Sequence, residues 1–221
     1  MTAISAITRM NALQIAQLNN SMAASQRVGG LGSRLDNMQY DGAAPVTVGT
    51  LVARKYLEYK IAPILGATNT IHATISLTAS AQLLYPIVLQ PDVPRVLTVT
   101  GTNSITTKVK FYGTDFAGTA ITDEITMSGT ATVLGVRAFK TVSAVDLPAK
   151  TTTDSVTLGV APTKVVMPSV VPYAGYLISA LFNGSADSGG SLAVHADLSK
   201  NIYTSAGSFN GTLELILVYV A

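Results

Sequence analysis

Cysteine and tryptophan are absent from the 221-residue chain, and charged side chains make up only 12% of it. Without cysteine, the chain has no disulfide bond and no thiolate metal site. Charged residues form about a quarter of an average soluble protein, so a monomer of this composition would have little protection against association. We therefore expect much of its surface to be covered by copies of itself or by another protein. The net charge of +2 is too small to indicate binding to nucleic acid.

No run of apolar residues approaches the roughly 18 needed to span a membrane. The longest, LELILVYVA at the C-terminus, has the length of a strand. The opening residues, MTAISAITRMNALQIAQ, lack the basic region and apolar core of a secretory signal. We therefore expect no contact with a membrane, and we interpret Asn183-Gly184 and Asn210-Gly211 as turns rather than glycosylation sites.

What the chain has instead is alternation, most clearly between Arg95 and Pro148, where Thr or Ser alternates with Val, Ile or Phe. A period of two is typical of strands with one wet and one dry face. Strands are predicted at 46–52, 70–78, 83–89, 96–100, 106–112, 120–127, 132–136, 141–146, 155–160, 176–182, 191–196 and 212–220. Residues 54–61 fit either a strand or a short helix, and Pro86 places its strand at a sheet edge or a bulge.

So many short, regularly spaced strands predict an all-β fold, namely an antiparallel β-sandwich or barrel over residues 46–221. A proline-rich passage interrupts this domain at 161–173. Two β subdomains that meet near 161–173 are an alternative to a single domain.

The N-terminal segment, residues 1–45, is predicted to be a helix followed by a linker. A period near 3.6 over residues 3–27 places five apolar side chains on one helix face: Ile4, Ile7, Ile15, Leu18 and Met22. Gly29 and Gly30 follow, as expected after a helix C-terminus. Such an amphipathic arm can dock on a neighbouring molecule or pack on its own β domain, and the sequence leaves both open.

One short motif resembles the surroundings of a catalytic serine. The residues DSGG at 187–190 are similar to those around the nucleophile of trypsin-like serine proteases, and His72, Asp115 and Ser188 follow that family's order along the chain. Ala186 departs from the family's motif, and His72 lies within an alternating strand. Because a catalytic triad is defined by geometry, we interpret the motif as a glycine-rich turn between strands.

Other polar pairs do not assemble a catalytic or metal site at the level of sequence. His195 and Asp197 would share one strand face, but two ligands are too few for zinc. Asp123 and Glu124 would point to opposite faces of a strand, so they cannot converge as the carboxylate pair of a glycoside hydrolase. We therefore expect no enzymatic activity, no cofactor and no metal ion.

The segment KYLEYK at 55–60 is unusual for its large, polar-tipped side chains. In an extended chain, Tyr56, Glu58 and Lys60 share one face and Tyr59 lies on the other. Tyrosine is favoured at protein interfaces because it offers a large area and one polar group. Tyr56 and Tyr59 are therefore candidate interaction residues, and the alternative is that they cover a sheet edge.

The central segment resembles a domain that recurs in structural proteins of tailed bacteriophages. The resemblance rests on Pro94-Arg95, on Gly113-Thr114-Asp115 with Gly118, on Ile121 to Ile125, and on Gly135 to Val142 followed by Leu147-Pro148. It covers about a quarter of the chain. No catalytic residues come with it.

This resemblance implies a virion structural protein, most like a capsid decoration or cement protein that binds between major capsid subunits and stabilises the head. The expected partners are the major capsid protein and copies of this chain, as a homotrimer or another homo-oligomer. The expected location is the capsid surface, after synthesis in the host cytoplasm. Two alternatives stay open: a ring-forming tail, neck or baseplate component, and a β-sandwich adhesion or carbohydrate-binding module, which the lack of tryptophan disfavours.

Overall fold

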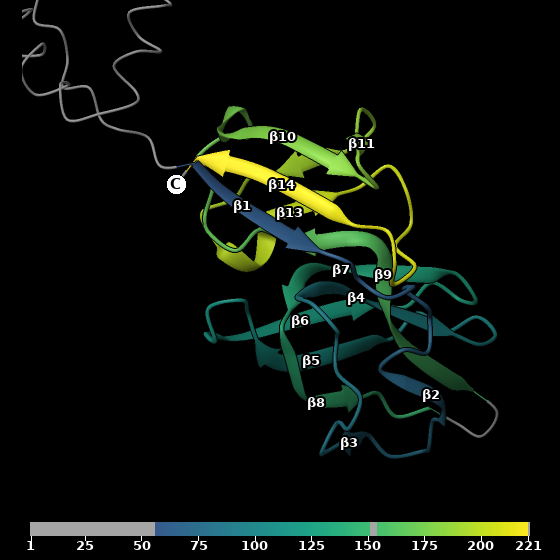
Figure 1. Ribbon diagram of the computed structural model, residues 1–221. Helices are drawn as coiled ribbons and strands as arrows, with labels where there is room; N and C mark the ends of the chain where they lie inside the picture. Colours follow the sequence, from purple (N-terminus) through teal and green to yellow (C-terminus); the bar gives the residue numbers. More distant parts are fainter. Residues whose placement is uncertain (1–55, 151–153, 221) are drawn as a thin grey trace, which may run out of the picture. The chain divides into compact units, whose positions relative to one another are not determined.

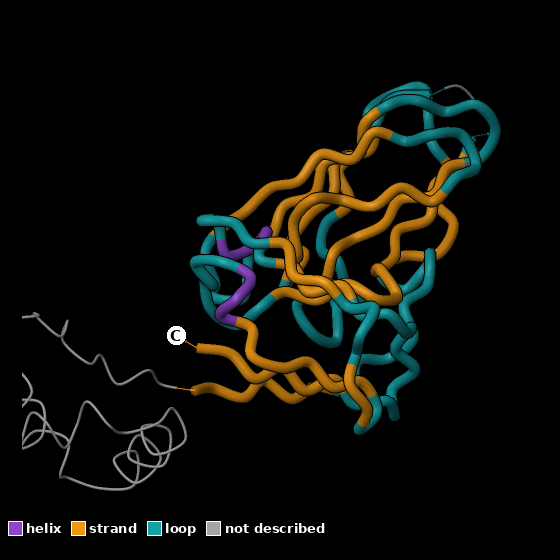
Figure 2. Tube along the Cα trace, turned by 90° about the horizontal axis from the view of Figure 1, so that it is seen from above, coloured by secondary structure: helices purple, strands orange, loops and turns teal. Residues whose placement is uncertain are grey.

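Fourteen strands make up most of residues 56–150 and 154–220, the part of the chain that the computed structural model describes (Figure 1). Every pairing between these strands is antiparallel. One sheet is curled like half a barrel, and helix among the described residues is limited to two short 3₁₀ turns (Figure 2). The predicted all-β antiparallel fold is therefore confirmed. The predicted arm at 1–45 and the predicted strand at 46–52 lie outside the described residues.

The first sheet has the strand order β3-β8-β5-β6. Its strands are β3 (Gln82–Leu84), β8 (Thr141–Leu147), β5 (Lys108–Thr114) and β6 (Ala120–Thr126). Alternate residues of β6 are buried, among them Ile121 and Ile125, as the period of two predicts. In the turn between β5 and β6, the Asp115 carboxylate accepts a hydrogen bond from the Thr119 amide (2.8 Å). β3 is an edge strand, but it ends at Leu84, so the prediction of a strand over 83–89 that contains Pro86 is wrong. Proline has no N–H to donate to a strand ladder, and the strand stops before it.

The second sheet is built around the long strand β9 (Ser155–Val166), in the order β12-β13-β9-β4-β7. Its other strands are β4 (Arg95–Gly101), β7 (Thr132–Phe139), β12 (Ser191–Ala193) and β13 (Ile202–Thr204). β2 (His72–Ser76) pairs with the first part of β9 and β13 pairs with the last part. β13 has no counterpart among the predicted strands, because three residues after the turn η2 (Leu198–Lys200) are too few for a periodic signal.

The prediction that the strand starting at Ser155 ends at Val160 is wrong, because β9 continues through Pro162. The pairing of β9 with β4 shifts at this point, from Leu97 opposite Val160 to Arg95 opposite Val165. The extra residues of β9 bulge out of the ladder, where the missing N–H of proline removes no regular hydrogen bond.

The third sheet has the order β1-β14-β10-β11. Its strands are β1 (Tyr56–Ile61), β14 (Leu215–Val220), β10 (Leu177–Phe182), which follows the turn η1 (Ala174–Tyr176), and β11 (Ser185–Ala186). Asn183 and Gly184, both with positive φ (51° and 77°), form the tight turn between β10 and β11. The Asn210 side chain accepts hydrogen bonds from the next amides along the chain, at Thr212 and Leu213. Both Asn-Gly pairs are thus turns, as predicted.

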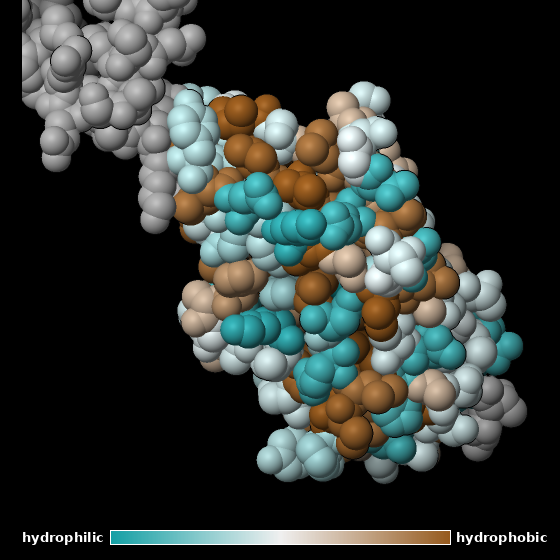
Figure 3. Space-filling model, viewed as in Figure 1, coloured by the Kyte–Doolittle hydropathy of each residue, from teal (hydrophilic) through white to brown (hydrophobic). Residues whose placement is uncertain are grey.

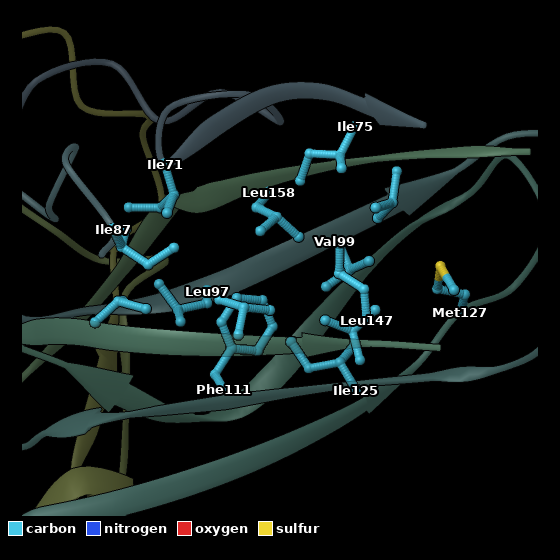
Figure 4. Packing of buried hydrophobic residues seen from close by; sticks show 14 of the residues in the cluster. Ile71, Ile75, Ile87, Leu97, Val99, Phe111, Ile125, Met127, Leu147 and Leu158 are labelled. Atoms are coloured by element: carbon cyan, nitrogen blue, oxygen red, sulfur yellow. The ribbon is translucent and has the colours of Figure 1, made fainter. Parts of the chain in front are cut away.

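Two large hydrophobic cores and a smaller third cluster around Val96 and Ile202 lie along this arrangement of sheets within one compact unit of the chain. The first fills the space between the first and second sheets, and its central side chains include Leu97, Val99, Phe111, Ile125 and Leu158 (Figure 4). The second packs the third sheet against the end of the second, with Val165, Tyr203, Phe209, Leu217 and Tyr219. β9 thus contributes to both cores, and the alternative of two subdomains that meet near 161–173 stays a prediction.

Candidate interaction surface

The longest uncharged stretch of the chain gathers exposed apolar side chains. Residues 61–91, which we name the uncharged strip, contain no Asp, Glu, Lys or Arg. Twelve large hydrophobic side chains are exposed in the described part of the chain, and six of them belong to the strip: Ile64, Leu65, Leu83, Tyr85, Val88 and Leu89. Contiguous exposed apolar surface marks interaction sites in soluble proteins. The uncharged strip is therefore the main candidate interaction surface.

The most exposed part of the uncharged strip follows β3 and is anchored to the first sheet. Ile87 is buried in the first core. The side-chain amide of Gln90 donates hydrogen bonds to the carbonyl oxygens of Ile87 and Val142 (2.9 Å each), and its oxygen accepts one from the Val142 amide (2.7 Å). These contacts fix the backbone to β8. Tyr85 (74% exposed) and Val88 (84% exposed) are thus displayed from an anchored segment.

A cleft of about 310 Å³ lies between the start of β2 and this segment. Its walls are Ile71, His72, Ala73, Pro86, Val88 and Leu89. The exposed His72 ring has its Nδ1 atom 2.9 Å from the carbonyl oxygen of Ala73. Figure 3 shows hydrophobic atoms gathered low in the view, in the region that Figure 1 labels β3. This chemistry suits an apolar side chain of a partner protein better than an ionic ligand.

The two candidate tyrosines of β1 have different surroundings. Tyr56 is 63% exposed and free to contact a partner. Tyr59 packs in the second core, with its ring centroid 6.0 Å from that of Phe116 in an edge-to-face arrangement. Burial, with smaller contributions from Tyr219 and Asp92, raises the pKa of Tyr59 to about 12. A role of either tyrosine in binding stays a prediction, and the candidates Ile4, Ile7, Ile15, Leu18 and Met22 lie outside the described residues.

The protease-like motif lies in the connection between β11 and β12, as a turn. Its aspartate, Asp187, accepts hydrogen bonds from the Tyr203 hydroxyl (2.7 Å) and the Ala206 amide (3.1 Å), while Ser188 is exposed. Among the hydrogen bonds of the described residues, none joins Ser188 to His72 or to the turn residue Asp115. Burial, together with the hydrogen bond to Asp187, raises the pKa of Tyr203 well above its ordinary value. Asp187 thus fixes the connection between β11 and β12 to Tyr203 and Ala206.

A second group of Ser, His and Asp residues lies around η2. The sequence pointed to His195 and Asp197 of this group but not to Ser199. The Ser199 hydroxyl donates to the Asp197 carboxylate (2.6 Å), which also accepts from Arg137 of β7 (2.5 Å). The Nδ1 atom of His195 accepts from the Asp197 amide (2.9 Å). Because the serine donates to the carboxylate and not to the imidazole, the order of a catalytic triad is absent from this group. The Asp-x-Ser spacing is a capping signal, and it identifies Asp197 as the cap of η2.

The pKa of Asp197 lies below its ordinary value. Burial opposes this shift, but the hydrogen bond from Ser199 and the positive charge of Arg137 outweigh it. The group therefore ties β7 to the segment around η2 through an ionised carboxylate. Its contribution to stability is present above the pKa of an unfolded aspartate and is lost as the pH falls through the lower, folded value.

The adjacent acids of β6 point to opposite faces, as predicted. Asp123 is buried, and one of its carboxylate oxygens accepts from the backbone amides of Val136 (2.8 Å) and Arg137 (3.1 Å). Glu124 is exposed and lies 2.5 Å from the Lys108 ammonium group, whose hydrogen bond and charge lower the pKa of Glu124. Asp123 thus bridges the neighbouring edges of β6 and β7, and these two carboxylates do not converge on a substrate.

Metal ligands do not converge either, since the described residues contain no group of three or more His, Cys, Asp or Glu side chains that could hold an ion. Among the same residues, no helix is both long and apolar enough to cross a bilayer. Comparison with family models, curated proteins and solved structures finds no match to this chain.

Proposed function

We propose that this chain is a structural protein of a tailed-bacteriophage virion, a decoration protein that binds between major capsid subunits on the outside of the head. The resemblance of its central segment to virion proteins motivates the proposal. A low charge content and an antiparallel β fold support it, because both are compatible with a surface covered by other molecules. The proposal includes a β-sandwich or barrel as the fold of the chain, with an N-terminal helical arm.

The observation that carries the proposal is the uncharged strip. The aliphatic side chains of Leu83, Val88 and Leu89, all in this strip, are more than half exposed to solvent. Complete burial of such a side chain contributes about 1.5–3 kcal/mol relative to full exposure, so each of the three retains about half of that or more to gain on binding. One such contact is weak, but contacts repeated across a capsid lattice add through multivalency. A cement protein stabilises a shell by this kind of additive binding.

Co-sedimentation with empty shells of the major capsid protein of the same phage tests this function. Val88→Lys places a charge in the middle of the uncharged strip, and we expect at least a tenfold loss of affinity, which corresponds to about 1.4 kcal/mol. Val136→Lys is the matched control, because Val136 is also exposed (61%) but lies on β7 outside the strip. The chain without residues 1–40 tests the arm, and we expect it to fold but not to stay attached.

Equal binding by the Val88→Lys and Val136→Lys variants would contradict the role of the strip. No binding of the unmodified chain to shells would contradict the function itself. Ring-shaped particles of the purified protein, seen by electron microscopy without affinity for shells, would instead identify a tail, neck or baseplate component.

A carbohydrate-binding module is the second candidate, and one observation favours it. Tyr173 is 51% exposed and its ring centroid lies 4.2 Å from that of Tyr176. The next residues, Ala174 and Leu177, line a cleft of about 410 Å³. Exposed aromatic rings beside a cleft can stack on sugar rings. A glycan array with saturable binding that Tyr173→Ala removes would support this candidate over the capsid role.

A further inference from the structure

The strand edges of the described part of the chain differ in how well they are protected. Open edges invite pairing with another chain unless they are short, interrupted or covered. β3, β11 and β12 have only two or three residues each, and a bulge interrupts β2. The edges of β6 and β7 are joined through the Asp123 carboxylate. β1 remains as the one long regular edge among the described residues.

β1 has the regular geometry that pairing with another strand requires. Its six residues pair with β14 in continuous register, and no described strand pairs with its other side (Figure 1). Proline is absent from β1 and first occurs beyond its end, at Pro63. One face of β1 packs in the second core through Leu57, Tyr59 and Ile61. The other face carries the exposed residues Tyr56, Glu58 and Lys60.

We propose that the outer edge of β1 binds the outer edge of β1 in a second copy of this chain, antiparallel about a two-fold axis at Tyr59. In this register Glu58 lies opposite the partner's Lys60, and Lys60 lies opposite the partner's Glu58. On the other face, Leu57 meets the partner's Ile61, so apolar residues continue the buried side. The two copies then share one continuous eight-stranded sheet, made of the third sheet of each.

Charge complementarity selects this register over its neighbours. A two-fold axis at Glu58 or at Lys60 places like charges directly opposite each other, which is destabilising. A shift by one residue places core-facing residues opposite solvent-facing ones. An axis at Leu57 leaves three residues of each β1 paired and an axis at Ile61 leaves one, whereas the axis at Tyr59 pairs five. The sequence YLEYKI is therefore self-complementary about its fourth residue.

A two-fold interface of this kind is isologous and closed, so it yields a dimer and not an open fibre. Lys60 also pairs with Glu214 of its own chain, at 2.9 Å. The occupant is a second copy because Glu58 and Lys60 each find an opposite charge in the same strand of the partner. This self-association goes beyond the proposed function and uses a different surface from the uncharged strip. A dimer can therefore exist whether or not the protein binds capsids.

Sedimentation velocity of the full chain over a range of concentrations tests the pairing. We expect a reversible dimer for the unmodified protein and roughly a tenfold or greater weakening for Glu58→Lys or Lys60→Glu, since each reversal converts two attractive cross-strand pairs into repulsive ones. Glu124→Lys is the control, because Glu124 is an exposed acid on β6 that pairs with Lys108 of β5. It should leave association unchanged.

Mixing the two single variants provides the decisive result. A Glu58→Lys chain has lysine at both positions and a Lys60→Glu chain has glutamate at both, so each meets only opposite charges in the other. We expect the mixture to form heterodimers at concentrations at which each variant alone is monomeric. A monomeric unmodified protein, a trimer, or a mixture that fails to associate would each overturn the proposal. Shell binding measured on the same samples reports separately on the capsid role.

Discussion

Arg95 is a fully buried cation, and its replacement should cost more stability than the loss of any exposed charge. Its guanidinium group donates two hydrogen bonds to the Ala161 carbonyl oxygen (2.6 and 3.2 Å) and one to the Ile64 carbonyl oxygen (2.9 Å). It also pairs with Asp92 at 3.1 Å and lies over the Phe209 ring. Burial lowers the pKa of Arg95, and Asp92 opposes this shift. The arginine thus fastens the bulge of β9 to the loop after β1.

Arg95→Met fills similar space but removes every one of these hydrogen bonds. The carbonyl oxygens of Ala161 and Ile64 then lose their donor, which costs about 1–3 kcal/mol for each buried group left unsatisfied. The Asp92 carboxylate also loses its cationic partner and keeps only the hydrogen bond from the Ile64 amide (2.7 Å). Breaking a buried ion pair from one side typically costs about 3–5 kcal/mol in total. We expect a loss of that size in the free energy of unfolding.

Urea unfolding followed by circular dichroism measures this loss. With a slope of about 2 kcal/mol per molar urea, the midpoint should fall by roughly 2 M. Lys108→Met is the control, because the Lys108 side chain is 62% exposed and solvent screens its ion pair with Glu124, so the midpoint should change little. Similar midpoints for Arg95→Met and Lys108→Met would refute the argument that the buried network fastens the bulge.

Two further predictions concern Asp123 and Tyr59. Asp123→Asn replaces one acceptor oxygen with a donor beside the amides of β7, so we expect a loss of about 1–3 kcal/mol in urea unfolding, with Glu124→Gln as a nearly neutral control. The pKa of Tyr59 is raised to about 12 in the folded protein, whereas an unfolded tyrosine ionises near 10. The contribution of Tyr59 to the free energy of unfolding is therefore fully present below the unfolded pKa, and it falls by up to about 2 kcal/mol as the pH rises towards 12. Tyr59→Phe should lose less between pH 9 and 11 than the unmodified protein, and an equal loss would contradict this prediction.

Local patterns predicted much of the fold because they report on single strands and turns. Alternation located β5, β6 and β8 to within a few residues, and the Asn-Gly pairs marked two turns. The opposite directions of Asp123 and Glu124 followed from strand geometry alone. The continuation of β9 through Pro162 did not follow, because only the pairing partner β4 reveals that a bulge accommodates the proline.

The candidate surfaces depended more strongly on contacts between distant segments. Composition predicted a covered exterior but could not say where, since Ile87 and Val88 are both apolar neighbours. The hydrogen bonds of Gln90 to Val142 on β8 decide that Ile87 enters the core and Val88 faces solvent. Likewise, the side chains of Tyr56 and Tyr59 were correctly separated into two faces, but only the order of the third sheet showed that no described strand pairs with the outer edge of β1.

Sequence alone therefore determined the type of secondary structure, the low charge content of the chain and the alternation of polar and apolar residues in each strand. These properties depend on composition and on neighbouring residues. Tertiary structure decided which edges stay open, which apolar residues remain exposed and why Arg95 can be buried. These properties depend on residues far apart in the chain, and a period of two carries no information about which strands will meet.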